Sequence, residues 1–174
     1  MTISLYDVSV RTYLQTTKAL ARFLDKGRAH FEEKGEDLSK VPDLRVYPDM
    51  LPLRFQIVSC AHHSLGALQA LQEGRFKPPR SADEDYAGLQ ARVKETIDGL
   101  KALTPEAVDA QQGKDLIFEF GDMELPFVAE DFILSFSLPN FYFHTTTAYD
   151  ILRMQGVPLG KADYMGPIRF KRGG

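Results

Sequence analysis

Four long segments in which apolar residues recur at steps of three and four constrain the fold of this chain more than any other feature. That spacing places the apolar side chains on one side of an α-helix. The segments cover residues 4–31, 49–74, 81–103 and 129–155. In the first, the stripe consists of Tyr6, Val10, Tyr13, Thr17, Leu20, Leu24 and Phe31. We predict an all-α fold, a four-helix bundle built as one domain over residues 1–174.

Residues that favour helix ends mark the limits of these segments. Ser4, Asp49 and Ser81 can each cap the N-terminus of a helix, and they precede the first three stripes. Gly74 and Gly156 follow the second and the fourth stripe, as expected of glycine after a helix C-terminus. We therefore predict helices close to these limits, with an irregular tail beginning at residue 157.

A change of period between the third and fourth helices indicates strands. Apolar and polar residues alternate over residues 115–120 and again over 123–127, and Gly121-Asp122 lies between the two runs. Two alternating runs joined by a two-residue turn of this type are typical of a β-hairpin. We predict a small hairpin inserted between helices 3 and 4 and packed on the bundle, because two strands alone are marginal in water.

Composition narrows the compartment and the partners. A lone cysteine, Cys60, excludes an internal disulfide and fits a reducing, cytoplasmic location. The net charge of −3, with few clustered basic residues, argues against a nucleic-acid partner. No run of apolar residues is long enough to span a membrane. The apolar hairpin and the Phe-rich fourth helix predict a homodimer, since one bundle would leave much of that apolar surface uncovered.

The fourth helix carries the polar residues that best indicate a site. At 3.6 residues per turn its inward stripe contains Asn140, His144 and Thr147 among apolar residues, which predicts that the first two lie at the centre of the buried face. These three residues are candidates to line a ligand pocket. A buried polar pair must find hydrogen bonds or a ligand, so it is either a structural network or a site. Pro139 lies inside the segment and should kink or split the helix.

The second helix contributes a further pair of candidates, His62 and His63. Adjacent residues on a helix point about 100° apart, so one of the two can face the interior and the other cannot face the same point. The apolar stripe favours His62, although contacts with two neighbouring helices leave either choice open. Cys60 is three residues before His63, but we expect it to be a buried, reduced and non-catalytic residue.

The C-terminal part of the fourth helix resembles a known family. The chain reads Asn-Phe-Tyr-Phe-His-Thr-Thr-Thr-Ala-Tyr over residues 140–149 and continues to Leu152-Arg153-x-x-Gly156-Val157-Pro158. It is similar to the last helix of the DinB/YfiT-like superfamily of metal-dependent four-helix bundles. Together with Gly160-Lys161-x-Asp163, it resembles an uncharacterised branch of that superfamily, and the similarity covers most of the chain.

The resemblance implies a metal site that this chain modifies. In the superfamily two histidines four residues apart on the last helix and a third from the second helix bind the metal. His144 matches the second of that pair, Asn140 occupies the place of the first, and His62 or His63 would be the third. The implied cofactor is a divalent transition metal, Zn or Ni, held by His62 or His63 with His144. Asn is a weak ligand for such a metal, which favours a branch that has kept the pocket and lost the metal.

Two functions therefore remain open at the level of sequence. One is an enzyme or former enzyme with a polar pocket between helices 2 and 4 that acts on a small molecule. In that case His144 would be a ligand or a general base. The other is a non-catalytic ligand-binding or structural module, dimeric and without metal, in which Asn140 and His144 only fix the packing of the core.

Overall fold

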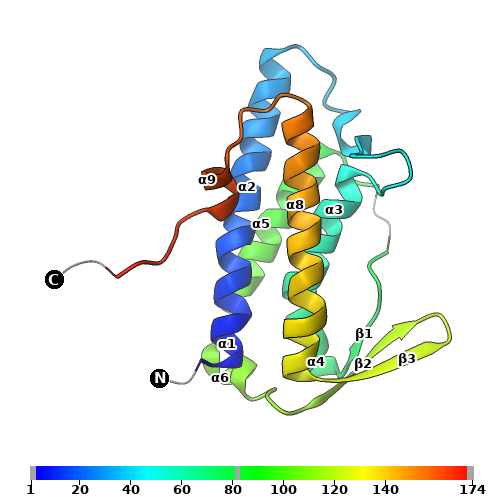
Figure 1. The fold of residues 1–174 in the computed structure, drawn as a ribbon, viewed down its shortest axis with the longest axis vertical. Helices are drawn as coiled ribbons and strands as arrows, with labels where there is room; N and C mark the ends of the chain where they lie inside the picture. The colour runs from blue at the N-terminus through cyan, green and yellow to red at the C-terminus, as the bar shows by residue number, and fades with distance from the viewer. Residues whose placement is uncertain (1–2, 81–82, 172–174) are drawn as a thin grey trace.

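Four helical segments lie side by side along the length of the molecule (Figure 1). The computed structural model describes residues 3–80 and 83–171. The segments are α1 (Leu5–Val8) with α2 (Val10–Glu33); α3 (Leu53–Ala61), η2 (His62–Gly66) and α4 (Ala67–Glu73); α5 (Tyr86–Ala102); and α7 (Ala129–Asp131), η3 (Phe132–Ser137) and α8 (Leu138–Met154). The predicted four-helix bundle with a small β insertion is confirmed. None of the helices in the described ranges is both long and apolar enough to cross a membrane.

A small sheet packs beside the lower end of the bundle in Figure 1. The predicted hairpin is confirmed as β2 (Asp115–Phe120) and β3 (Met123–Val128), which pair in antiparallel register. A third strand, β1 (Arg75–Phe76), pairs in parallel with β2 and gives the order β1-β2-β3. Strand β1 was not predicted, because a strand of two residues is too short to show alternation. Strand β1 begins a segment, residues 75–80, that we call the strap.

The register of the hairpin places most of its apolar residues, including all three phenylalanines, on one side. Residues directly opposite one another share a face, and successive pairs alternate between faces. The pairs on this apolar face are Leu116↔Phe127, Phe118↔Leu125 and Phe120↔Met123. At the base Leu116 is 1% exposed, whereas at the tip Phe120 is 57% exposed. The base of the hairpin therefore packs on the bundle and its tip extends beyond it.

Two π-helical turns interrupt otherwise α-helical segments, η2 in the second and η3 in the fourth. A π turn bonds residue i to i+5 and so holds one residue more than an α turn, which rotates everything that follows it. The centre of the buried face of α8 is consequently Phe141, Thr145, Ala148 and Leu152. The prediction that Asn140 and His144 lie at that centre is wrong, since both are half-buried at its edge.

The predicted break at Pro139 occurs earlier in the chain. The α-helical pattern is interrupted over η3, and α8 begins at Leu138, with Pro139 in its first turn. Proline has no N–H and its ring clashes with the preceding turn of an α-helix. A wider π turn directly before Pro139 accommodates that ring, and the segment continues as one helix in Figure 1.

Two helix starts differ from the prediction, and the tail contains a helix that was not predicted. The second helix begins at Leu53 and not at Asp49. Pro52 is its N-cap residue, and the Leu53 N–H donates to Leu44 O over 2.8 Å. The third begins at Tyr86, where the Asp85 carboxylate accepts from the Gly88 N–H, and Ser81 lies outside the described residues. Within the tail a short helix, α9 (Lys161–Met165), packs on α2.

A glycine allows α2 to approach α5 closely. A Cβ on Gly27 would lie 2.6 Å from Tyr86 Oη, and that hydroxyl donates to Leu24 O over 2.8 Å. Although alanine favours a helix over glycine by about 1 kcal/mol, we expect Gly27→Ala to lower the free energy of unfolding by about 1–3 kcal/mol. In a Tyr86→Phe background, which lacks the hydroxyl, the loss should be much smaller. Urea unfolding of the four proteins tests this, and equal losses in both backgrounds would contradict it.

Candidate functional site

A cavity of about 310 Å³ lies between the second and fourth helical segments, with the strap and β2 at its sides. This volume is at the lower end of those of small-molecule sites, roughly 300–1,000 Å³. The lining residues are aromatic, proline or uncharged polar, and none is an Asp, Glu, Lys or Arg: Phe55, Ser59, His63, Phe76, Pro78, Pro79, Phe118, Phe120, Phe136, Asn140 and His144. The cavity therefore suits an uncharged molecule with an apolar body.

His63 from η2 and His144 from α8 face each other in this cavity. Their ring centroids are 5.9 Å apart and their planes differ by 18°. Burial lowers the pKa of His63 to about 3, with smaller contributions from the neighbouring His62 and His144. Burial also lowers the pKa of His144 to about 4. Because both values lie well below 7, both imidazoles are neutral at neutral pH.

A hydrogen-bond chain fixes the tautomer of His144. The Gln56 amide nitrogen donates to Leu51 O over 2.7 Å, which turns the amide oxygen toward His144. His144 Nδ1 lies 2.7 Å from that oxygen, an acceptor, so Nδ1 carries the proton and donates. A neutral ring with its proton on Nδ1 has its lone pair on Nε2. His144 can therefore offer a hydrogen-bond acceptor to a ligand.

Two buried polar atoms in the lining have no hydrogen-bond partner in the described part of the chain, Ser59 Oγ and His63 Nδ1. Ser59 is 0% exposed and His63 5% exposed, so both are taken out of water. A buried polar atom without a partner costs about 1–3 kcal/mol, and such atoms are uncommon in folded proteins. A ligand with a hydrogen-bonding group would remove this cost.

A buried contact between the two π turns supports the position of His63. The Ser137 hydroxyl, in η3, donates to the backbone carbonyl of His63, in η2, over 2.7 Å. It accepts in turn from the Tyr13 hydroxyl of α2 over 2.9 Å. This chain of bonds links the backbone of His63 to α2 through Ser137 and so holds η2 and η3 together.

The other two residues expected in the pocket differ in position. Asn140 lines the cavity, and its amide nitrogen donates to Phe136 O over 2.8 Å. Thr147 is buried but is not one of the lining residues, and its hydroxyl donates to Phe143 O over 2.8 Å. A threonine hydroxyl bonded to the preceding turn of its own helix is a common structural arrangement. Thr147 is therefore a residue of the helix packing.

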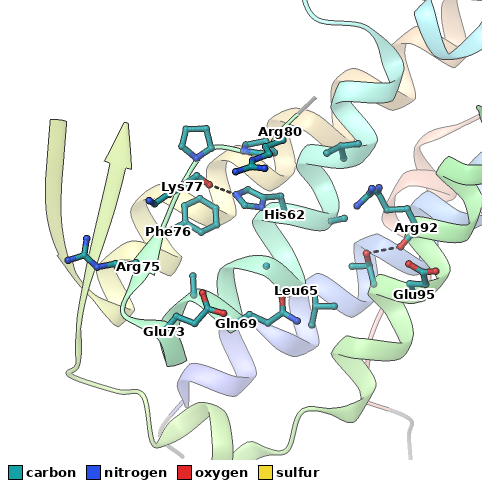
Figure 2. A pocket seen from close by; sticks show the side chains of 17 residues that line it. His62, Leu65, Gln69, Glu73, Arg75, Phe76, Lys77, Arg80, Arg92 and Glu95 are labelled. Atoms are coloured by element: carbon teal, nitrogen blue, oxygen red, sulfur yellow. Dashed lines mark hydrogen bonds between the residues drawn. The ribbon is translucent and has the colours of Figure 1, made fainter. Parts of the chain in front are cut away.

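His62 points into a second and larger cavity, a groove of about 840 Å³ beside α3, α4 and α5 (Figure 2). Its ring stacks on Phe76 with centroids 4.3 Å apart, and its Nε2 lies 2.6 Å from the Lys77 carbonyl oxygen. Phe76, Pro78 and Pro79 line both cavities, so the strap is the wall between them. The adjacent histidines of η2 thus face different cavities, and His63, not His62, is the one that meets His144.

Three of the four basic residues that line this groove, Arg75, Lys77 and Arg92, pair with acidic residues. Arg92 makes two bonds with Glu84. Arg75 and Lys77 both pair with Glu119 on β2. The pairs with Glu119 attach the strap to the sheet, and the pair with Glu84 attaches the loop before α5 to α5. Because these cations are neutralised by carboxylates, they do not form a positively charged site for an anion.

The three histidines considered as metal ligands do not converge. His62 Nε2 is bonded to Lys77 O in the other cavity, which leaves His63 and His144 as a pair. Across residues 3–80 and 83–171 no group of three His, Cys, Asp or Glu residues is placed to hold a metal ion. Catalytic zinc sites usually use three protein ligands. The donor set of this cavity therefore does not fit the metal centre that the resemblance implies.

Cys60 is buried next to the cavity, and its thiol has low reactivity. Its Sγ lies 3.2 Å from Thr145 Oγ1, and burial raises the pKa of the thiol to about 12. Since the thiolate is the reactive form, we expect iodoacetamide to modify the native protein far more slowly than the unfolded protein at pH 7.5. Mass spectrometry of the two time courses tests this. Modification of the native protein at the rate of the unfolded one would contradict it.

Three residues of the site escape sequence reasoning, Gln56, Ser59 and Phe76. Gln56 and Ser59 lie among apolar residues of α3 that give no reason to select them, although a buried polar residue one turn before His63 could have been noticed. Phe76 follows the helix in a segment without periodicity. Only the pairing of β1 with β2 places its ring against both histidines of η2.

The fold has a counterpart among solved structures. The chain is similar to a DinB family member protein from Shewanella denitrificans, known from its crystal structure, with 26% sequence identity, a TM-score of 0.81, and coverage of 97% of this chain and 96% of that chain. Fold and similarity together define a DinB-like helical bundle. A family model described as a domain of unknown function, DUF1993, matches residues 5–165, and this chain belongs to that family. None of the curated proteins matches it.

Proposed function

We propose that this chain is a cytoplasmic protein that binds an uncharged small molecule carrying a hydroxyl group, in the cavity between η2 and α8. The observation that carries the proposal is a pair of buried atoms, Ser59 Oγ and His63 Nδ1, that have no partner among residues 3–80 and 83–171, in a cavity to which those residues contribute no charged side chain. An apolar cavity with a few convergent polar groups is the usual form of a ligand site.

The hydrogen-bonding pattern supports a hydroxyl group. His144 offers an acceptor at Nε2, because its Nδ1 proton is bonded to Gln56. The Ser59 hydroxyl can donate or accept, and the neutral His63 ring can do either according to its tautomer. A ligand hydroxyl can donate to His144 and accept from Ser59 or His63. A carboxylate or phosphate would have no cation among the lining residues to balance its charge.

Binding fits the two histidines better than acid–base catalysis. A general base works best when its pKa is near the working pH. With pKa values of about 3 and about 4, His63 and His144 are weak bases and are hardly protonated at neutral pH. The proposal is accordingly a pocket inherited from a metal-dependent bundle and used without the metal.

Titration calorimetry with 4-methylphenol tests the proposal, with Ser59→Ala and Ser64→Ala as matched variants. Both serines are buried on the same helical segment, but the Ser64 hydroxyl is already bonded to Cys60 O over 2.6 Å and does not line the cavity. We expect saturable 1:1 binding that Ser59→Ala weakens by about tenfold, one hydrogen bond being worth about 1 kcal/mol or more. Ser64→Ala should bind normally.

The same variants separate a ligand site from a structural network by their stability. Because Ser59 Oγ has no partner, Ser59→Ala should leave the free energy of unfolding unchanged or raise it by up to about 1 kcal/mol. Ser64→Ala should lower it. A large loss of stability in Ser59→Ala, together with no binding of 4-methylphenol to the wild type, would show that these groups serve the fold and would overturn the proposal.

Two alternatives have their own tests. A metal-dependent enzyme predicts stoichiometric zinc or nickel in protein purified without a polyhistidine tag, and that result would refute the metal-free pocket. A structural dimer is favoured by the exposed apolar tip of the hairpin, where Phe120 and Met123 are 57% and 48% exposed. Light scattering at micromolar concentration that gives the mass of one chain would exclude the dimer.

A further inference from the structure

The cavity continues into an exposed apolar surface on the hairpin. Phe118 and Phe120 line the cavity, and they lie on the apolar face of the hairpin opposite Leu125 and Met123. The latter two are 39% and 48% exposed and are not lining residues of the cavity. We call Phe120, Met123 and Leu125 the shelf. The shelf begins where the cavity opens, because Phe120 belongs to both.

The burial of this face is graded from the bundle outward. At its base Phe127 packs on Phe132 with ring centroids 5.8 Å apart, and Phe118 packs on Phe136 at 4.8 Å. Beyond Phe118, no aromatic pair among the described residues includes Phe120. Apolar side chains held on a paired strand and left in water form a surface that an apolar partner would stabilise.

The opposite face of the hairpin is mixed, with Asp115, Glu119 and Glu124 beside Ile117, Pro126 and Val128. Glu119 and Glu124 lie opposite each other on it, and Glu119 pairs with Arg75 and Lys77 of the strap. These ion pairs attach the mixed face to the strap, so that the face with Phe118 and Phe120 is the one left toward the cavity mouth. The arrangement gives a path that is polar at its inner end, at His63 and His144, and apolar from Phe118 outward.

We propose that the ligand is an uncharged amphiphile, with a hydroxyl head between His63 and His144 and an apolar tail that leaves the cavity along the shelf. This inference rests on the proposed function, since it requires the head to bind in the cavity. The volume of about 310 Å³ holds a head of the size of a phenol together with the first carbons of a tail. The occupant of the shelf is thus the tail of the bound molecule and not a second copy of this chain.

A series of 4-alkylphenols with methyl, propyl, pentyl and heptyl chains tests the inference by titration calorimetry below their aggregation limits. Each methylene that the shelf takes out of water should strengthen binding about three- to fourfold. The double variant Met123→Ser with Leu125→Ser should lose most of this increase for pentyl and heptyl. Val128→Ser is the matched control, because Val128 is 40% exposed on the opposite face of the same strand and should retain the whole increase.

The outcomes separate the two proposals. If 4-methylphenol binds and the longer phenols bind no better, the tail site is refuted and the head site stands. If no member of the series binds, both are refuted. If the Val128→Ser control loses the increase as fully as the double variant, the tails bind elsewhere and the shelf is refuted. A dimer in light scattering that the double variant abolishes would assign the shelf to a second copy and would also overturn the inference.

Discussion

Between pH 7 and pH 5 we expect the free energy of unfolding to fall by up to about 4 kcal/mol, about 2 kcal/mol from each of His63 and His144. The unfolded chain binds a proton at each histidine near pH 6.5, whereas the folded protein does so only near pH 3 and pH 4. The unfolded state therefore binds more protons in this window, so stability is present above pH 6.5 and is lost as the pH falls. Urea unfolding at half-unit steps of pH measures the slope.

Variants at the two histidines test whether His63 and His144 cause this dependence of the free energy of unfolding on pH. His144→Gln should remove about half of the loss and the double variant His63→Gln with His144→Gln most of it. The carboxylates whose pKa is lowered by ion pairs, such as Asp98 beside Lys94 and Asp163 beside Lys26, titrate at lower pH. Burial also lowers the pKa of His62, so His62 adds to the loss with the same sign and accounts for part of the slope that remains in the double variant. A double variant with the slope of the wild type would show that the histidines are not held neutral by burial.

Phe76→Ala should cost about 3–5 kcal/mol of unfolding free energy, the loss typical of a large buried side chain. Phe76 is 3% exposed, stacks on His62, and packs against Phe132 with centroids 5.0 Å apart. Removing the ring leaves a void in the wall that separates the two cavities. Thermal and urea unfolding measure the loss.

Phe120→Ala is the control for that substitution. It removes the same atoms from the sheet and from the lining of the small cavity, but Phe120 is 57% exposed. Its cost should stay below about 1 kcal/mol. If Phe76→Ala were no more destabilising than Phe120→Ala, the strap would not be a packed wall between the two cavities. His62 and His63 would then not be kept in separate cavities by Phe76.

The bundle could be predicted from sequence because its signal is repeated many times. In α2 the residues Tyr13, Leu20, Leu24 and Phe31 were expected on the buried stripe, and each is 0% exposed. One misplaced residue hardly changes a pattern of that length. The hairpin was predictable for a similar reason, since alternation on both sides of Gly121-Asp122 fixes the register.

The site depends on single residues and on π turns, which produce no repeated pattern in the sequence. His144 was expected at the centre of the buried face and lies at its edge, because a π turn shifts the register by one residue and no residue type marks that turn. His63 was selected only jointly with His62, since an ideal helix favoured the wrong one of the two. The unpaired hydroxyl of Ser59 is a matter of three-dimensional surroundings, which one-dimensional periodicity does not contain.

The π turn η3 has a consequence for how this chain is compared with its relatives. A helix that contains such a turn has one residue more than an α-helix spanning the same distance, so a relative with an uninterrupted α-helix would need a one-residue gap within residues 132–137. An alignment without that gap can match Asn140 and His144 correctly or Phe132 and Ile133 correctly, but not both pairs. Removing one residue within η3 should therefore act as a rotation and turn the whole of α8, with His144, relative to α3.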